Sequence, residues 1–288
     1  VFNIQARNID PLSLEMIPAL EKRANWQHRL QQYHRERLSW RQIINIIERH
    51  HGKQSLELLS PLTSLGKSYL FVSPTEFEYQ HDVSTSSGES YLRRAYRIAS
   101  EHPDADWEVV ENSMLSLGDY YVLSGRSNRA ARTYEETWEY LTEGDDPERL
   151  RARREHLEKV KILQKVFPPR YYNAEQLDDG RPPPDDFKQG TMSFTYAVSP
   201  SGRVVNLKHL ETQPREITDF DKGVGRNLRR LIYRPRMKDG VVVATGDVVY
   251  THEFYYREED LPRLPPADAE APAGEPVSED DTSRDSSP

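Results

Sequence analysis

The sequence contains no cysteine, and this absence excludes disulfide bonds, thiolate nucleophiles and cysteine-ligated metal sites. It also lacks a run of about 20 apolar residues, which is the length that a membrane-spanning helix requires. No apolar core of a secretory signal peptide opens the chain either. Because the sequence begins at Val1 without an initiator Met, we expect a signal or anchor segment to have been removed or to lie upstream of it.

An excess of basic charge is also missing. The formal net charge is −8, whereas a nucleic-acid surface needs clustered Lys and Arg side chains to neutralise phosphates. The nearest candidate is the arginine-rich run of Arg149, Arg151, Arg153 and Arg154. Glutamates at positions 148, 155 and 158 accompany this run, and opposite charges at helical spacing favour a solvated helix face. We therefore expect no nucleic-acid partner.

The common catalytic and ligand-binding motifs are absent as well. The triplet Gly66-Lys67-Ser68 resembles the end of a phosphate-binding loop, but it falls inside a helical pattern rather than after a strand. His50-His51 and His102 have no partner at the spacing of a metal site, and no Gly-x-Ser-x-Gly elbow occurs. The sequence predicts a protein that is not an enzyme and that binds no cofactor or metal. An enzyme or enzyme subunit ranks third, after the two binding functions given at the end of this section.

With 288 residues the chain is long enough for two compact units. In residues 1–167 apolar residues recur three and four positions apart, which predicts a helical domain. In residues 168–257 the pattern alternates instead, which predicts a small α+β domain. Residues 258–288 are rich in Pro, Ala, Ser, Asp and Glu and predict a disordered acidic tail. The expected fold class is a two-domain chain with a helical solenoid in front and a mixed domain behind.

One helical segment, residues 107–143, has a regular pattern of small and aromatic residues. Its key positions are Leu117, Gly118, Tyr121, Gly125, Ala130 and Tyr134. Gly118 and Ala130 are small enough for two antiparallel helices to approach closely, and Gly125 suits the turn between them. The segment resembles a tetratricopeptide repeat, which implies a helical pair that stacks with further copies.

Two further copies are predicted upstream of this repeat. The copy at residues 55–102 has Leu62, Leu65, Gly66 and Tyr69 in its first helix and Leu92, Tyr96 and Ala99 in its second. An insertion at about residues 72–89 separates the two helices and is too polar for a core. The copy at residues 13–49 is degenerate, with Trp40 in its aromatic position, and all four tryptophans are expected in the repeat cores. A capping helix is expected at residues 148–167.

The second domain is predicted to contain two strands, a helix and a final strand. The alternating positions that define the first strand are Met192, Phe194, Tyr196 and Val198, and those that define the final strand are Val248, Tyr250, His252, Phe254 and Tyr256. A turn at residues 199–202 leads to a returning strand through Val205 and Leu207. The helix begins after Thr218 or Asp219, with positions 220, 224, 228 and 231 on its apolar face.

Residues 190–256 resemble the C-terminal domain of TonB-type energy transducers. The matching features are the glycine and alternating strand at 190–198, the glycine and valine strand at 202–207, the helix entered at Phe220-Asp221, the exit Tyr233-Arg234-Pro235, and Gly240 before a strand ending in Phe254-Tyr255-Tyr256. The resemblance implies the order β-β-α-β, a location in the Gram-negative periplasm and recognition of protein partners. The transducers also have an N-terminal membrane helix and a proline-rich spacer, and this sequence has repeats instead, so recognition is implied rather than energy transduction.

Two partner-binding sites follow as hypotheses. The first helices of stacked repeats line a groove for a peptide or partner helix, and the expected groove residues are Thr63, Lys67, Leu70, Asn112, Leu115, Asp119 and Val122. The final strand is expected at a sheet edge, where a partner segment can add as a further strand. The residues of this edge site are Val248, Tyr250, His252, Phe254 and Tyr256. The alternative is that residues 171–188 or a second copy of the chain cover the edge.

The function that these patterns favour is a non-enzymatic periplasmic adaptor that binds protein or peptide partners, among them outer-membrane or periplasmic proteins. Two alternatives stay open. One is an assembly or structural factor of the envelope whose second domain self-associates into a homo-oligomer, and the other is a divergent TonB-type transport component. A size that depends on concentration favours assembly, and a stable monomer with a foreign partner favours the adaptor.

Overall fold

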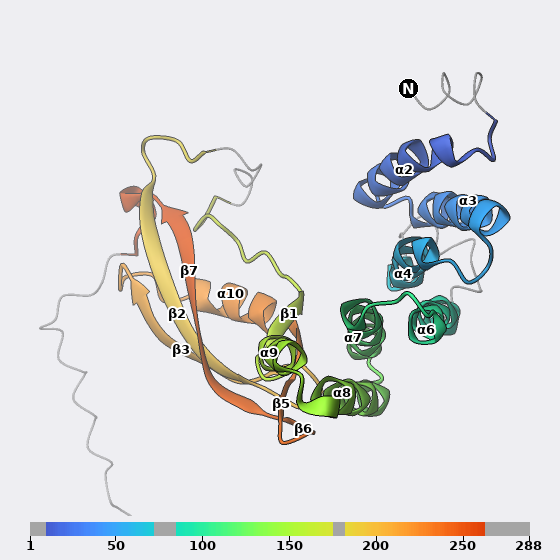
Figure 1. Cartoon of the computed structure of the whole chain (residues 1–288). Coiled ribbons are helices and arrows are strands. Elements are labelled where there is room, and N and C mark those ends of the chain that lie inside the picture. Colours follow the sequence, from blue (N-terminus) through green and yellow to red (C-terminus); the bar gives the residue numbers. More distant parts are fainter. Residues whose placement is uncertain (1–9, 72–84, 175–181, 263–288) are drawn as a thin grey trace, which may run out of the picture.

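The computed structural model describes residues 10–71, 85–174 and 182–262, and it has two parts (Figure 1). The first is an array of helices, and the second is built around a three-stranded antiparallel sheet with one helix. The predicted layout, helical in front and mixed behind, is confirmed at this level.

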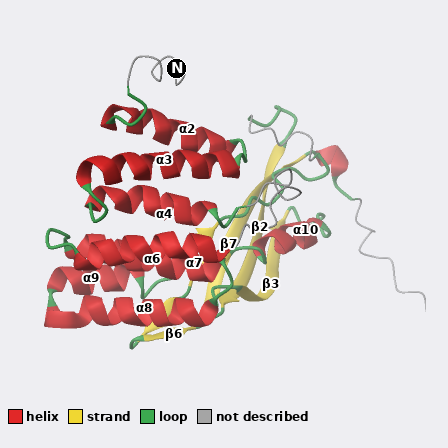
Figure 2. Ribbon diagram, turned by 90° about the vertical axis from the view of Figure 1, so that its right-hand side faces the viewer, coloured by secondary structure: helices red, strands yellow, loops and turns green. Residues whose placement is uncertain are grey.

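The array contains seven longer helices within the described residues. These are α2 (Ile17–Arg29), α3 (Tyr33–His51), α4 (Leu59–Ser68), α6 (Thr85–Glu101), α7 (Trp107–Leu123), α8 (Ser127–Thr142) and α9 (Pro147–His156), with the 3-10 turns η1 (Leu14–Met16), η2 (Leu56–Leu58) and η3 (Glu143–Asp145). They stack in chain order as the pairs α2/α3, α4/α6 and α7/α8, as Figure 2 shows. The helices α2 to α8 bury the apolar stripe that their three-and-four spacing creates, whereas α9 has no buried residue.

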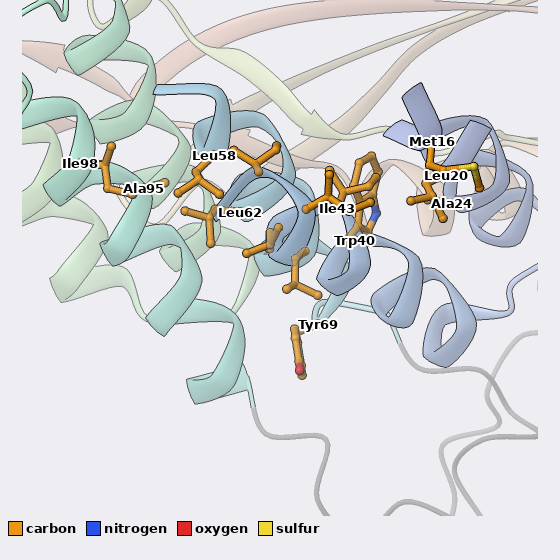
Figure 3. Packing of buried hydrophobic residues seen from close by; sticks show 14 residues of the cluster. Met16, Leu20, Ala24, Trp40, Ile43, Leu58, Leu62, Tyr69, Ala95 and Ile98 are labelled. Atoms are coloured by element: carbon orange, nitrogen blue, oxygen red, sulfur yellow. The ribbon is translucent and has the colours of Figure 1, made fainter. Parts of the chain in front are cut away.

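One continuous apolar core joins the first two pairs. It runs from Met16 and Leu20 through Trp40, Ile43 and Leu62 to Ala95 and Ile98 (Figure 3). Trp40 therefore lies in the core as predicted. Trp26 does not, because 55% of it is exposed. It lies on α2, the outermost of the described helices, where no earlier helix of the described part covers it.

The close approach of α7 and α8 follows from the small residues that the sequence pattern identified. A Cβ atom at Gly118 would lie 2.5 Å from Cε1 of Tyr134, which is too close for any side chain. Ala130 is buried, and Gly125 adopts a φ of 75° in the turn, where glycine avoids the strain that a Cβ atom would cause. The packing reasons predicted for these residues are confirmed.

Two boundaries in the array differ from prediction. Residues 72–84 of the predicted polar insertion lie outside the described residues, but residues 85–89 begin α6, and Gly88 and Glu89 are buried. Helices α4 and α6 approach so closely here that a Cβ atom at Gly88 would lie 2.6 Å from the carbonyl oxygen of Gly66. A polar residue can be buried when its polar atoms have hydrogen-bond or ion-pair partners. Glu89 has such partners in Tyr121, Arg126 and Arg129.

The predicted capping helix is shorter than expected. It ends as α9 at His156 rather than at residue 167, and Lys161–Gln164 forms strand β1 instead. Strand β1 pairs antiparallel with β4 (Ile232–Arg234) from the second part of the chain. This long-range pairing outweighs the local helical pattern, as tertiary contacts often do.

The second part is a sheet with strand order β3-β2-β7. Its elements are β2 (Lys188–Val198), β3 (Val204–Gln213), α10 (Phe220–Leu228) and β7 (Thr245–Tyr256), together with the short strands β5 (Arg236–Lys238) and β6 (Val241–Val243) and the 3-10 turn η5 (Glu258–Asp260). Residues of β2 alternate between buried and half-buried from Gly190 to Val198, as the sequence predicts. Phe194 and Tyr196 share one core with Val224 of α10 and Phe254 of β7.

Three features of this part were not predicted. The strands β4, β5 and β6 have three residues each, which is too short for an alternating pattern to be recognised. Val205 was expected to support the returning strand, but it is exposed and Val204 is buried in its place. The predicted disordered tail begins too early, since residues 258–260 form η5 and Leu261 packs on the sheet core. Residues 263–288 of that tail lie outside the described residues.

The two parts share a hydrophobic core. Tyr120, Leu141 and Leu157 of the array cluster with Ile232 and Met237 of the second part. The backbone N–H of Met237 also donates to the carbonyl of Leu157 over 2.7 Å. The array is thus a base on which the sheet is fixed.

Candidate functional site

The first candidate site, the predicted groove of the helical array, is occupied at α7 by the chain's own second part. Leu115 and Val122 are buried in the core shared by the two parts. A Cβ atom at Gly202, in the turn between β2 and β3, would lie 3.0 Å from Cγ1 of Val122. The prediction that Leu115 and Val122 face a partner is therefore wrong, because the turn and the β1/β4 ribbon cover this face of α7.

Asp119, the third predicted groove residue on this face, forms a buried ion pair with Arg234 of β4. Its two carboxylate oxygens accept hydrogen bonds from Nε and Nη2 of Arg234 over 2.8 and 2.7 Å, a two-pronged geometry that makes such pairs strong. The hydroxyl of Tyr134 donates to the same carboxylate over 2.8 Å. Only 3% of the Arg234 side chain and 14% of that of Asp119 are exposed. Asp119 therefore holds the two parts of the chain together, and it is not free to bind a foreign partner.

The remaining predicted groove residues are not brought together into an open site. Lys67 is half-buried on α4, and burial lowers the pKa of its ammonium group, with Arg234 and Lys161 acting in the same direction against the attraction of Asp119. Thr63 and Leu70 are also half-buried, and only Asn112 is exposed.

The second candidate site is the free edge of β7. This strand pairs with β2 on one side only, so its predicted position at a sheet edge is confirmed. The side chains predicted for the site point the other way, however. Phe254 and His252 are buried in the sheet core, and Val248, Tyr250 and Tyr256 pack against it. Because side chains alternate along a strand, those of Val249, Thr251 and Glu253 lie on the opposite face and are exposed.

The backbone of the odd-numbered residues points away from β2. Tyr255 donates its N–H to the carbonyl of Arg170 over 2.7 Å and accepts from the N–H of Tyr172 over 2.8 Å. Since backbone groups alternate in direction along an antiparallel strand, those of Val249, Thr251 and Glu253 also point outward. Among the described residues, none forms a backbone hydrogen bond with these outward groups.

Part of the edge is thus covered by the chain itself. The short segment 169–172 lies against the Tyr255 end of β7, through the Tyr255 hydrogen bonds and a parallel bridge between Tyr171 and Tyr255. The alternative that residues 171–188 cover the edge is confirmed at this end through Tyr171 and Tyr172, and residues 175–181 of that range lie outside the described residues. The uncovered stretch in the described structure, residues 249–253, is called the β7 edge below.

His252 lies where the covered and uncovered stretches meet. Its Nε2 is 2.8 Å from the carbonyl oxygen of Pro169, and since a carbonyl can only accept, Nε2 must carry the proton. Burial lowers the pKa of this imidazole, although the Pro169 carbonyl and Glu253 oppose the change. His252 therefore acts as a neutral donor that fixes the covering segment.

The other edge of the sheet, β3, is much less regular. Its pairing with β2 slips twice, between Ser193 and Phe194 and between Thr195 and Ala197, and Asn206 adopts a φ of 55°. Bulges and kinks of this kind protect an edge against strand addition. By contrast, β7 keeps one register with β2 from Tyr256 to Val248. The exposed apolar side chain of Val249, 65% accessible, lies beside this regular edge.

The described residues contain no group of three or more His, Asp and Glu side chains that could hold a metal ion. None of the described helices has both the length and the apolar character needed to cross a membrane. Comparison of the chain with models of known protein families and with curated proteins finds no match. The resemblances to tetratricopeptide repeats and to TonB domains therefore rest on residue patterns alone.

Proposed function

We propose that this protein is a non-enzymatic adaptor that binds an extended segment of a protein partner at its β7 edge. The observation that carries the proposal is the regular β7 edge, in which the outward backbone groups of Val249, Thr251 and Glu253 have no backbone partner among the described residues. A partner segment would add there as a further strand, with main-chain hydrogen bonds supplying affinity and the exposed Val249 side chain adding an apolar contact.

The helical array has a supporting role in this proposal. We propose that it consists of tetratricopeptide-like repeats, which is supported by the stacked pairs and the glycine contact of α7 with α8. The array holds the second part of the chain through the shared core and through Asp119 and Arg234 of β4, so it supports the sheet that contains β7.

The proposed location is the periplasm of a Gram-negative cell, and it rests on the resemblance of residues 190–256 to TonB C-terminal domains. A divergent transport component of TonB type stays an alternative for this domain. Fractionation of cells that express the full gene product tests the location, because recovery in the cytoplasmic fraction would contradict it.

The binding proposal can be tested by removing one outward N–H group. Val249→Pro deletes a donor that faces away from β2, so the sheet keeps its own hydrogen bonds, and proline is tolerated at edge strands. Val249→Ile keeps the donor, the β-branch and the apolar surface, and it serves as the matched control. Chemical cross-linking in Gram-negative cells should capture a partner with the wild type and with Val249→Ile, and it should lose that partner with Val249→Pro.

Deuterium exchange identifies the surface directly. Addition of the captured partner should slow exchange at the amides of Thr251 and Glu253, since these then donate to the added strand. The proposal fails if Val249→Pro captures the same partner in the same amount, or if exchange in residues 249–253 does not change when the partner binds.

Self-association through the same edge is the second candidate function. Two β7 strands paired antiparallel about Thr251 would place Glu253 of one copy opposite Val249 of the other, so no like charges would meet. Sedimentation velocity separates this candidate from the adaptor. A size that rises with concentration in the wild type and not in Val249→Pro supports assembly, whereas a monomer in both variants supports the adaptor.

A further inference from the structure

A second surface lies on the opposite side of the array from the sheet. Helices α6 and α8 border a groove of about 830 Å³, and Leu117 and Tyr121 of α7 form part of its lining. Each residue turns a helix by about 100°, so Leu117 and Tyr121, two positions to either side of Asp119, point away from the interface that Asp119 makes. The groove is therefore independent of the β7 edge.

Arginines line both walls of this groove. Arg93, Arg94 and Arg97 come from α6, and Arg129 and Arg132 come from α8, with Glu136 of α8 as the acidic residue of the lining. Arg94 is paired with Glu48 of α3. Arg97 has no acidic partner among the described residues, and Arg132 has only Glu136, 3.3 Å away on its own helix. The Arg132 side chain is 81% exposed, and ion pairs this exposed contribute little to stability. Arg132 therefore stays available to an anionic ligand. The groove is thus a cationic surface on a protein whose net charge is −8.

A buried glutamate fixes the geometry of the inner arginines. Glu89 of α6 lies 3.0 Å from Arg93 and 2.8 Å from Arg129, it also pairs with Arg126, and it accepts a hydrogen bond from the hydroxyl of Tyr121 over 2.9 Å. Burial acts to raise the pKa of Glu89, but the Tyr121 hydroxyl and the arginines lower it overall. One carboxylate shared by three guanidinium groups leaves positive charge in excess.

We propose that this groove binds a short acidic peptide segment of a protein partner. Arg93 and Arg97 lie one helical turn apart, about 6 Å along α6, and every second residue of an extended peptide lies about 6.7 Å apart. A segment with carboxylates at alternate positions can therefore follow the arginines of the α6 wall, while the residues between them lie over the groove floor, beneath which Leu117 and Tyr121 are almost fully buried. The excess negative charge of the whole protein repels a long polyanion, which favours a short peptide over a nucleic acid.

Isothermal titration calorimetry with the full chain tests this inference. The probe is a short peptide of alternating glutamate and leucine, and the reference peptide replaces each glutamate with glutamine. The glutamate peptide should bind, and its affinity should fall as the salt concentration is raised. The glutamine peptide should not bind. Equal binding of the two peptides would overturn the inference, as would tighter binding of oligothymidylate.

Paired variants locate the site. Arg97→Gln with Arg132→Gln removes two groove arginines that do not touch Glu89, and it should lower the affinity for the glutamate peptide about tenfold or more through the loss of two charged contacts. Arg151→Gln with Arg154→Gln removes two exposed arginines of α9, with the same change in net charge, and it should leave binding unchanged. Equal affinity in the two double variants would show that the groove is not the site.

Discussion

The ion pair between Asp119 and Arg234 is one residue-scale contact that holds the second part of the chain on the array. Because both side chains are largely buried, removing one partner leaves an uncompensated charge, which costs about 3–5 kcal/mol. We expect Asp119→Ala and Arg234→Met each to lower the free energy of unfolding by about this amount. The double variant should lose clearly less than the sum, because it leaves no charge unpaired. Urea unfolding of the four proteins measures the coupling, and strictly additive losses would contradict it.

His252 gives a residue-scale prediction about pH. Its pKa is lowered in the folded protein, while the unfolded chain has the ordinary value of about 6.5. As the pH falls from neutral through about 6.5 towards the lower folded value, the unfolded state takes up the proton first, so the folded state loses stability. Above that window the contribution is fully present. His252→Gln should remove this part of the pH dependence, and urea midpoints from neutral to acidic pH measure it. A constant difference between wild type and variant across that range would show that His252 does not titrate as described.

At the element scale, the contact of α7 with α8 depends on the absence of a side chain at position 118. A Cβ atom there would overlap the ring of Tyr134, so Gly118→Ala should destabilise the protein by about 1–3 kcal/mol as an overpacked core. This loss should exceed the gain of about 1 kcal/mol from helix propensity. Gly223→Ala in α10 is the control, because its Cβ atom meets nothing within 4 Å and the change should stabilise by about 0.5–1 kcal/mol. Stabilisation by both changes in thermal unfolding would refute the close contact.

The elements that the sequence predicts well are those whose apolar period repeats several times. Strand β2 and helix α10 show the expected faces, because nine or more residues give a clear period. The three-residue strands β4 to β6 carry no such signal. The edge position of β7 was likewise predictable. Its outward residues could have been derived too, since the same alternation that buries Phe254 exposes Val249.

At the scale of the whole molecule, the groove prediction failed because local sequence patterns do not reveal contacts with distant parts of the chain. The residues of α7 look available in sequence, but Asp119 is bound by a residue 115 positions away. An exposed repeat face and one covered by a distant strand have the same local spacing. The arginine groove was missed for a related reason. Its walls come from α6 and α8, each an ordinary amphipathic helix in sequence, and only their packing collects the charges.

The shared core predicts that the two parts unfold as one unit. Tyr120 and Leu157 pack with Ile232 and Met237, so loosening the interface should expose both sides together. All four tryptophans, at positions 26, 40, 107 and 138, lie in the array. Tryptophan fluorescence therefore reports the array, and hydrogen exchange of the β2 amides reports the sheet. In the wild type the two measurements should give the same free energy of unfolding.

With Gly202→Val, fluorescence and hydrogen exchange should give different free energies of unfolding. A Cβ atom at this position would lie 2.1 Å from the carbonyl oxygen of Tyr233 and 3.0 Å from Val122, so the new side chain would force the β2–β3 turn away from α7. Exchange of β2 should then report a lower stability than fluorescence, because the sheet opens while the array stays folded. Gly246→Val is the matched control, since the Cβ atom there meets open space and the measurements should still agree. If fluorescence and exchange already differ in the wild type, the interface does not couple the two parts, and the array is not the rigid base from which the β7 edge is presented.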